Sequence, residues 1–402
     1  MVPSLPNPVS SRALSVLQVF NRYLKPGGEE KSIVRMALDL EGGGHRVTRF
    51  WRETALWEKP GGPSKARQAF LLWKNPAVLE ELRQAHETAR PDVWILHNVV
   101  PVVSLGVYRL ARRLGVPIIQ FLHNYRPISP SGTLFINQQQ QRPEDRWLVW
   151  KEVYHGCWHG RLATAILALG YAQVKCRGDF EAVRAWVPVS DEMKRIFERA
   201  GWYPDRLHTL RHSWHAQPPP AQPRDEGYFL YLGRMYEEKG VRFLIDLWAA
   251  PELRDVQLVM AGDGPLATEL RERCSSNVRW LGHVEGETKL RWKAGCRAIL
   301  FPSIWPEPLS TVAYEAYEMN KPMLASSSGG MPEVVHSEQT GLLLPPGDRN
   351  AWLQAILRLS QNPGLSQQMG ERGRAWLDRE VSPQRWVEQF NVIAHRAGVT
   401  KP

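Results

Sequence analysis

Two glutamates in WPEPLSTVAYEAYE, residues 305–318, are candidates for binding hydroxyl groups. The apolar run RAILFPS precedes them, and the sequence predicts a strand there, then a helix that begins near Ser310. Backbone N–H groups at Thr311 and its neighbours would make the start of that helix an anion site. Glu315 could then reach the two hydroxyls of a ribose, and Glu307 the hydroxyls of a sugar. Alternatively, Glu307 only adds favourable charge near a helix start and Glu315 pairs with a cation.

Two cations in YLGRMYEEKG, residues 231–240, are candidates for binding a diphosphate. The predicted strand ends at Gly233, so Arg234 and Lys239 lie on the turn that follows it. Ligands of open α/β sheets lie beyond the carboxyl ends of the strands. An Arg fork and a Lys point charge would hold a diphosphate there. Alternatively, both are ordinary solvated cations.

Three further segments contain weaker candidates. Gly262 and Gly264 in MAGDGP allow a tight turn or a close ligand approach, and the structural turn is the favoured interpretation. In FNRYLKPGGEEKSIV, a strand is followed by a glycine-rich loop and a helix that begins near Gly28 or Glu29. The backbone at Gly28 could approach a sugar or phosphate. His123 ends the run PIIQFLHN, where it is either a structural residue or a ligand contact.

The elements that must position these residues are parallel strands covered by helices. Short runs rich in Val, Ile and Leu alternate with helical patterns along the chain, which is typical of an α/β fold with two doubly wound sheets. The predicted strands are LSVLQVF, HRVTRFW, VWILHN, PIIQFLHN, AWVPVS and RLHTL in the first half, and YFLYLG, VQLVMAG, VRWLG, RAILFPS, PMLASS and GLLLPP in the second.

A length of 402 residues favours two domains. The proline-rich stretch HSWHAQPPPAQPRDEG is the predicted linker. SPSGTLFINQQQQRPEDRW is predicted to be a long loop, and SPQRWVEQFNVIAHRAG a final helix with an apolar face. The predicted segments are a first domain over 1–211, the linker over 212–227, a second domain over 228–380 and the C-terminal helix over 381–402.

Composition narrows the cellular setting. Four widely separated cysteines without a Cys-x-x-Cys pair indicate reduced thiols in a cytoplasmic protein. The N-terminus does not have the pattern of a signal peptide, and the longest apolar stretch is too short to span a bilayer. The net charge of +10 is spread over helices, which favours a weak attraction to an anionic membrane surface over nucleic-acid binding. The other alternative is a basic surface that serves no particular partner.

Taken together, these segments resemble the family 4 retaining glycosyltransferases of GT-B fold (glycosyl transferases group 1). The matching pieces follow the family's order over nearly the whole chain: PGGEE, IIQFLHNYR, VPVSDEMKR, YLGRMYEEKG, MAGDGP, NVRWLGHV, FPSIWPEPLSTVAYEAYE, GGMPEVV and TGLLLPPGD. The resemblance implies two Rossmann-like domains that face a central crevice. The second would bind the donor nucleotide sugar and the first the acceptor, and the last helix would cross back to the first domain.

The resemblance also implies a role for individual residues. Arg234 and Lys239 match the pair that binds the diphosphate, Glu315 the glutamate on the ribose, and Glu307 the glutamate on the donor sugar. Gly28 matches the loop glycine near the phosphate, and His123 the histidine near the donor sugar. His283 and Val284 lie where the family binds the nucleobase. The remaining positions expected around the donor are Gly262, Leu309, Ser310 and Thr311.

The implied reaction moves a hexose from a UDP- or GDP-linked donor to a hydroxyl of a glycan or lipid-linked acceptor, with retention of the anomeric configuration. No cofactor and no metal are expected, and the chain contains no Asp-x-Asp metal anchor. The segment from HNYRPISPSGTLF to YHGCWHGR resembles the subset that builds bacterial exopolysaccharide, capsule or lipopolysaccharide. Many members have Phe-Gly-Leu where this chain has Leu309, Ser310 and Thr311, which puts contacts that depend on a glycine at 310 in doubt.

Three other functions stay open at this point. A nucleotide-sugar epimerase on the same fold would share the diphosphate and ribose contacts. A catalytically silent partner would bind sugar nucleotides without transferring the sugar. A basic nucleic-acid-binding protein would show strong, salt-sensitive binding to nucleic acid.

Overall fold

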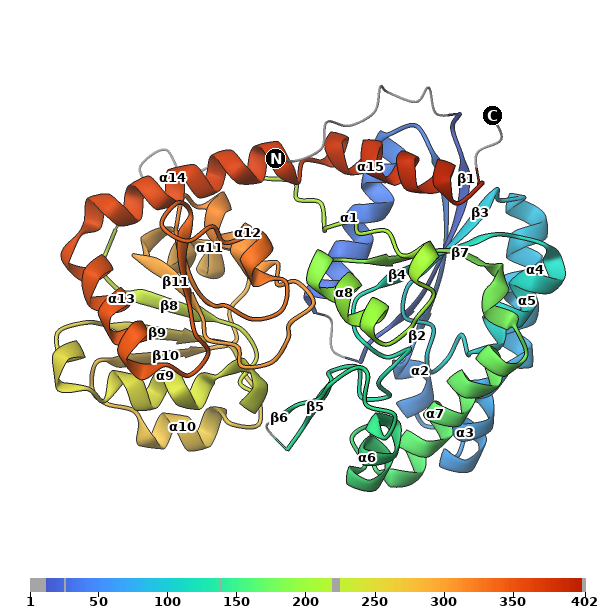
Figure 1. Ribbon diagram of the computed structural model, residues 1–402, viewed down its shortest axis with the longest axis horizontal. Coiled ribbons are helices and arrows are strands. Elements are labelled where there is room, and N and C mark those ends of the chain that lie inside the picture. Colours follow the sequence, from blue (N-terminus) through green and yellow to red (C-terminus); the bar gives the residue numbers. More distant parts are fainter. Residues whose placement is uncertain (1–11, 25–26, 138, 219–224, 400–402) are drawn as a thin grey trace. The chain divides into compact units, whose positions relative to one another are not determined.

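The computed structural model describes residues 12–24, 27–137, 139–218 and 225–399 (Figure 1). The chain divides into two compact units. The first comprises Met1–Ile136, Gln141–Ser213 and Pro383–Pro402, and the second Asn137–Gln140 and Trp214–Ser382. Part of the predicted linker, residues 219–224, and the N-terminal segment considered for a signal peptide, residues 1–11, lie outside the described residues.

The first unit is built on a five-stranded parallel sheet in the order β2-β1-β3-β4-β7. Its strands are β1 (Ser15–Arg22), β2 (Arg46–Glu53), β3 (Val93–Leu96), β4 (Ile118–Leu122) and β7 (Val183–Pro188). The α-helices are α1 (Gly28–Gly42), α2 (Ala55–Glu58), α3 (Lys65–Trp73), α4 (Pro76–Ala89), α5 (Gly106–Leu114), α6 (Leu148–His155), α7 (Arg161–Cys176), α8 (Asp191–Arg199) and α15 (Pro383–Arg396). Short 3₁₀ turns are η1 (Asp179–Ala182) and η2 (Pro204–Arg206), and the predicted long loop contains the small strands β5 (Phe135–Ile136) and β6 (Gln139–Gln140).

The second unit is built on a six-stranded parallel sheet in the order β10-β9-β8-β11-β12-β13. Its strands are β8 (Phe229–Leu232), β9 (Leu258–Ala261), β10 (Val278–Gly282), β11 (Ala298–Phe301), β12 (Met323–Ser326) and β13 (Gly341–Leu344). The α-helices are α9 (Val241–Trp248), α10 (Ala267–Arg273), α11 (Gly286–Gly295), α12 (Val312–Glu318), α13 (Arg349–Gln361) and α14 (Pro363–Glu380), and the 3₁₀ turns are η3 (Glu237–Lys239), η4 (Pro251–Leu253) and η5 (Met331–Glu333).

Both sheets reverse their strand order once. In the second unit, β8, β9 and β10 progress to one side, whereas β11, β12 and β13 progress to the other, so the reversal falls between β8 and β11. In the first unit, it falls between β1 and β3. Chain segments that leave neighbouring strands at such a point diverge, which leaves room for a ligand at the carboxyl edge. The predicted α/β class with doubly wound parallel sheets is confirmed.

One predicted strand is wrong. The run RLHTL forms only an isolated bridge, between Trp186 and Leu207, although the N–H groups of His208 and Leu210 both donate to β7. For a ladder to form, the backbone N–H at position 188 of β7 would have to donate a hydrogen bond to the RLHTL segment, and residue 188 is a proline. Because proline has no N–H group, the ladder cannot continue. The other eleven predicted runs each contain a strand.

Helix α15 packs into the core of the first unit, although more than 160 residues separate it from Ser213 in the sequence. Trp386 and Phe390 are buried and stack on each other with ring centroids 5.7 Å apart. Trp386 also lies 6.2 Å from the ring of Phe121 on β4, and Phe390 lies 5.9 Å from His45. The apolar face predicted for the last helix is therefore part of the core that supports β4.

The packing of α15 gives a testable prediction. Phe390→Ala should lower the free energy of unfolding by about 3–5 kcal/mol, because it removes a buried aromatic ring and leaves a cavity. Glu388→Ala on the exposed side of the same helix is the control and should change it by less than about 0.5 kcal/mol. Urea titration followed by circular dichroism measures both. Equal stabilities of the two variants would contradict this account of α15.

Candidate functional site

Lys239 and Glu307 form a close ion pair at the carboxyl edge of the second sheet. Lys239 ends η3, just after β8, and Glu307 lies on the loop after β11, so the pair spans the point where the strand order reverses. The Lys239 Nζ atom lies 2.7 Å from Oε1 and 2.5 Å from Oε2 of Glu307. The side chains are only 11% and 14% exposed. A largely desolvated ammonium thus lies where an anionic ligand is expected.

The backbone around Lys239 is held from two sides. On one side, the carbonyl of Glu238 accepts hydrogen bonds from Ser303 Oγ at 3.1 Å and from the N–H of Ile304 at 3.0 Å. On the other, Arg242 Nε donates to Glu237 Oε2 at 2.7 Å. These contacts fix η3 against the loop after β11, and so fix the distance between Lys239 and Glu307.

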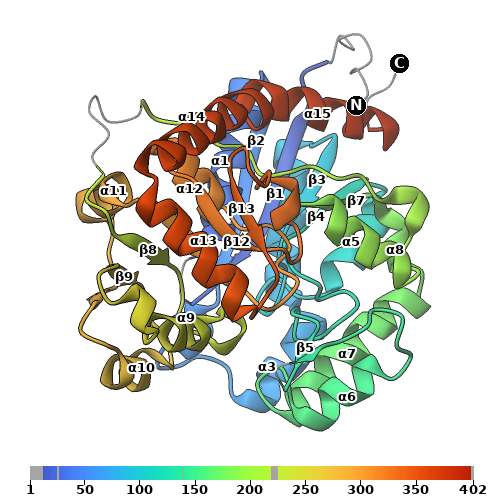
Figure 2. The same cartoon turned by 60° about the vertical axis from the view of Figure 1, so that its left-hand side comes forward.

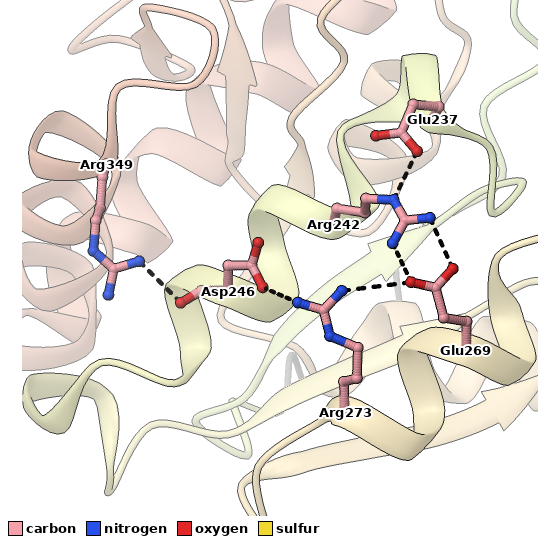
Figure 3. Close-up of polar contacts among 6 residues, drawn as sticks. All are labelled: Glu237, Arg242, Asp246, Glu269, Arg273 and Arg349. Atoms are coloured by element: carbon pink, nitrogen blue, oxygen red, sulfur yellow. Dashed lines mark hydrogen bonds and ion pairs between the residues drawn. The ribbon is translucent and has the colours of Figure 1, made fainter.

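An ion-pair network extends this support to three helices (Figure 3). Arg242 pairs with Glu269 on α10 as well as with Glu237. Arg273 reaches both Glu269 and Asp246 at the end of α9, and the Asp246 carbonyl accepts from Arg349 on α13. Exposed pairs contribute little to stability one by one, but a network restricts the geometry of the elements that it connects. It connects η3 to α9, α10 and α13.

Glu315 forms a second charged cluster nearby on α12. Its carboxylate lies 2.6 Å from Lys289 Nζ and 3.5 Å from Lys293 Nζ, both on α11. Lys293 is buried and also lies 3.4 Å from Glu318. The alternative in which Glu315 pairs with a cation is therefore confirmed as far as the pairing goes. Neither lysine was a predicted site residue, although their spacing of four residues places them on one face of a helix.

The remaining predicted positions of the second unit lie around the same edge. Arg234 follows β8, is exposed, and its guanidinium lies 5.2 Å from the ring centre of Tyr236. Leu309 and Ser310 are buried, and Thr311 is the residue before α12. The helix begins at Val312, two residues later than predicted, and the Val312 N–H donates to Ser310 Oγ at 3.3 Å. His283 is exposed and pairs with Glu285, and Val284 is half-buried beside it.

Two glycines at this edge are required by backbone packing. Gly262 has a φ of 144°, and a Cβ atom there would lie 1.8 Å from the carbonyl oxygen of Gly233. Gly329 has a φ of 56°, and its Cβ would lie 2.1 Å from the carbonyl oxygen of Glu307. A larger residue at either position would displace the loops that carry Arg234 and Glu307. This supports the structural interpretation of the MAGDGP turn.

In the first unit, His123 belongs to a chain of hydrogen-bonded and stacked side chains. His97, directly after β3, places Nδ1 3.1 Å from Nε2 of His123, which follows β4. The ring of His123 stacks on that of His212, with centroids 5.7 Å apart and planes 3° apart. Burial lowers the pKa of His123 to about 3 and lowers the pKa values of His97 and His212. All three rings are therefore neutral at neutral pH.

The hydrogen bonds also determine the tautomer of His123. Gln18 Nε2 lies 3.2 Å from the carbonyl oxygen of Ile33, which can only accept, and 3.1 Å from Nε2 of His97. Gln18 therefore donates to His97, whose proton must be on Nδ1 and is donated to Nε2 of His123. The proton of His123 is then on Nδ1, a buried atom without a hydrogen-bond partner among the described residues. Neither His97 nor His212 was a predicted site residue, although HN ends both VWILHN and PIIQFLHN.

Gly28 is exposed and is the first residue of α1, as the sequence predicts. Behind it, Tyr23 Oη donates to Glu29 at 2.9 Å, and Arg22 pairs with Glu30 at 2.5 Å. Burial raises the pKa of Glu29 to about 7. The start of this helix thus carries a carboxyl that is partly protonated at neutral pH.

Comparison with known proteins establishes the family. The model of the glycosyl transferase 4-like domain matches residues 27–212, and that of glycosyl transferases group 1 matches residues 226–362. The chain belongs to the GT-B glycosyltransferases of family 4. The resemblance inferred from the motifs is confirmed.

Relatives of this family 4 chain are named as transferases of different sugars. Alpha-D-kanosaminyltransferase of Streptomyces kanamyceticus is 28% identical over 66% of both chains. D-rhamnosyltransferase WbpZ of Pseudomonas aeruginosa is 31% identical over 39% of this chain and 44% of its own. The chain therefore spans two thirds or less of the length of these relatives.

Solved structures agree on the fold. Sucrose-phosphate synthase from Thermosynechococcus elongatus superposes with a TM-score of 0.67 at 18% identity, covering 96% of this chain and 97% of its own. Anabaena Alr3699/HepE in complex with UDP and glucose gives a TM-score of 0.64 at 18% identity, covering 93% and 98%. The superpositions support the GT-B fold of this family 4 chain. At 18% identity they do not identify its substrates.

The neutral state of His123 gives a pH-dependent prediction. A histidine with a lowered pKa stays neutral on folding, while the unfolded chain takes up a proton below pH 6.5. Acidification should therefore destabilise the wild type relative to His123→Gln, by up to about 1.4 kcal/mol for each pH unit below 6.5. Urea titrations at several pH values measure the difference. His283→Gln is the control, because that ring is exposed. A pH-independent difference would contradict the burial of His123 as a neutral ring.

Proposed function

We propose that this family 4 chain is a retaining, metal-independent hexosyltransferase. It transfers a hexose from a UDP- or GDP-linked donor to a hydroxyl of a glycan or lipid-linked acceptor. The two relatives described above are named as sugar transferases, and one structural neighbour was solved in complex with UDP and glucose. These findings support transfer from a sugar nucleotide, and the hexose, the base and the retention of configuration are part of the proposal.

The observation that carries this proposal is the position of the Lys239–Glu307 pair at the strand-order reversal. We assign Arg234 and Lys239 to the diphosphate of the donor. An incoming diphosphate competes with Glu307 for the Lys239 ammonium, since it is also an anion and carries more charge. Glu307 is then released to accept hydrogen bonds from the hydroxyls of the donor sugar.

We assign Glu315 to the ribose. Its carboxylate has two oxygens with several acceptor sites, so the ion pairs with Lys289 and Lys293 leave capacity for two hydroxyl donors. The two lysines hold the orientation of this carboxylate on α12. The assignments of His283 and Val284 to the base, of Gly28 to the phosphate and of His123 to the donor sugar remain predictions.

The proposed reaction needs no protein nucleophile. The bond between the anomeric carbon and the diphosphate oxygen breaks, and the acceptor oxygen bonds to the same face of that carbon. The proton of the acceptor hydroxyl passes to the departing phosphate oxygen. Arg234 and Lys239 stabilise the charge that develops on this leaving group, which is the electrostatic part of catalysis.

The setting that we propose is bacterial exopolysaccharide, capsule or lipopolysaccharide synthesis at the inner face of the plasma membrane. One relative is an O-antigen chain mannosyltransferase of Escherichia coli, 24% identical over 51% of this chain. No helix in the described part of the chain combines the length and apolar character needed to cross a bilayer. Access to a lipid-linked acceptor would then require contact with the membrane surface.

The diphosphate assignment predicts a selective loss of function. Lys239→Ala and Arg234→Ala should each lower kcat by about 10²- to 10³-fold, because a cation that stabilises the leaving group is lost. Glu315→Ala should mainly weaken donor binding, by about 10- to 100-fold in Kd, because hydrogen bonds to a charged group are lost. Calorimetric titration with UDP, GDP, ADP and dTDP identifies the base, and an assay with the corresponding sugar nucleotides gives kcat.

Arg372→Ala is the control for lost charge, because this arginine is exposed on α14. It should leave both binding and turnover near wild type. Near-normal turnover in both Lys239→Ala and Arg234→Ala would refute the diphosphate site. Conversion of the donor in the absence of an acceptor would favour the epimerase.

Retention and metal independence are tested on the product. The anomeric configuration of the new linkage, read from its proton coupling constant by NMR, should equal that of the donor. Saturating EDTA should leave the rate unchanged, because the proposed charge stabilisation comes from Arg234 and Lys239. An inverted linkage would refute the same-face reaction, and a rate restored only by divalent cations would refute metal independence.

A further inference from the structure

Helices α6 and α7 of the first unit expose an unusual group of large apolar side chains. Trp147, Trp150 and Tyr154 are 54%, 67% and 66% exposed. Leu162 and Leu169 on α7 are 76% and 58% exposed. Single exposed apolar residues are ordinary, whereas several on one helix pair indicate an interaction surface. We call these five residues the α6–α7 face.

Spacing places these side chains on one side of each helix. Trp147, Trp150 and Tyr154 are separated by three and four residues, and Leu162 and Leu169 by seven, so each set repeats with the helical turn. The buried positions of α6, Leu148 and Glu152, belong to its opposite side. Each helix therefore has an apolar side that the described residues leave exposed, opposite the side that is buried.

Buried contacts hold α6 in this orientation. The Glu152 carboxylate accepts from the N–H of Ser131 at 2.8 Å and from its hydroxyl at 3.0 Å, and also from Ser129 Oγ. These bonds lie under the helix and oppose its rotation. The outward direction of Trp150 and Tyr154 is consequently built into the fold, because turning them inward would leave a buried carboxylate without its donors.

The same surface continues toward α3. Trp73 on α3 donates from Nε1 to the carbonyl of Ile166 at 2.7 Å, which fastens α3 to α7. Phe70, on α3, is 62% exposed. Both views show α6, α7 and α3 side by side (Figures 1 and 2). The exposed apolar residues thus occupy a layer of three neighbouring helices.

Cations lie beside these aromatic rings. The Arg146 guanidinium is 5.3 Å from the ring centre of Trp147, and that of Arg161 is 5.0 Å from the ring centre of Tyr154. Residues 142–177 carry six cations and three acids, a net charge of +3, and one of the acids is the buried Glu152. The cations are Arg142, Arg146, Lys151, Arg161, Lys175 and Arg177, and the acids other than Glu152 are Glu144 and Asp145, within the same range.

We propose that the α6–α7 face docks on the surface of an anionic lipid bilayer. Trp and Tyr prefer the boundary between headgroups and acyl chains, Leu enters the apolar layer, and Arg remains with the lipid phosphates. The net charge of +3 over residues 142–177 complements the negative charge of an anionic leaflet. The inference gives the proposed function a route to a lipid-linked acceptor. Because binding to vesicles is measured without any substrate, the two proposals fail independently.

The test is flotation of the full chain with phosphatidylcholine vesicles that contain or lack an equal part of phosphatidylglycerol. The wild type should float with the anionic vesicles at low salt and much less with phosphatidylcholine alone. The triple variant W147S/W150S/Y154S should lower the partition coefficient by about 30-fold or more, because three interfacial anchors are lost. Arg146→Ser and Arg161→Ser should each lower it by about fivefold at low salt.

Leu38→Ser and Leu290→Ser are matched controls, since these leucines are 48% and 46% exposed on α1 and α11. They should float as the wild type does. Flotation is preferred to intrinsic fluorescence because the chain has 17 tryptophans, which would mask a change at two of them. Failure of the wild type to bind anionic vesicles, or equal binding by the triple variant, would overturn the proposal.

Sedimentation velocity separates the bilayer from a second copy of the chain. A dimer that the triple variant converts to a monomer, together with unchanged vesicle binding, would mean that this face joins two copies and would overturn the proposal. Nucleotide titration and thermal unfolding should match the wild type in every variant. If the triple variant does not fold, Trp150→Ser alone provides the test, with an expected loss of about fivefold.

Discussion

The reversal of strand order between β8 and β11 is the constraint on which the candidate site depends. All strands of this sheet are parallel, so the segments after them leave at one edge, and only at the reversal do neighbouring segments diverge. The loop after β11 and the turn η3 lie on either side of that gap, and Lys239 and Glu307 meet across it. Ser303 Oγ and the N–H of Ile304 donate hydrogen bonds to the carbonyl of Glu238, which fixes η3 against the loop after β11. The chemistry of the site follows from this placement.

Buried polar side chains form ion pairs in the second unit, whereas those around His123 in the first unit are uncharged. In the second unit, the ammonium groups of Lys239, Lys289 and Lys293 lie 2.5, 2.6 and 3.5 Å from carboxylate oxygens. In the first unit, His97, His123 and His212 have no carboxylate partner among the described residues, and burial lowers their pKa values until the rings are neutral. A charged cluster suits a diphosphate, whereas a neutral imidazole with a fixed proton suits hydrogen bonding to an uncharged sugar. This difference fits the separate roles that we propose.

The partly buried ion pair between Lys239 and Glu307 also has an energetic meaning. Desolvation makes Lys239 and Glu307 costly unless each has a partner, and here each is the partner of the other. A bound sugar nucleotide would give Lys239 a phosphate partner and Glu307 hydroxyl partners in place of each other. The apolar side chains of the α6–α7 face differ from this ion pair, because they are exposed to water. Covering them would be favourable, since it removes apolar surface from water.

The amino-acid sequence predicts the α/β class and eleven of the twelve strand positions, because apolar runs and the residues that end them are local features. For the same reason it predicts the start of α1 near Gly28 or Glu29, and the placement of Arg234, Lys239, Glu307 and Glu315 after strands. The failure at RLHTL depended on Pro188, a residue of another strand. Contacts between distant residues were decided only by the tertiary structure. His97, His123 and His212 form one chain although 115 residues separate the first from the last, and Lys239 meets Glu307 across 68 residues. No local pattern encodes such distances, because they arise from strand order and from the packing that fixes each loop.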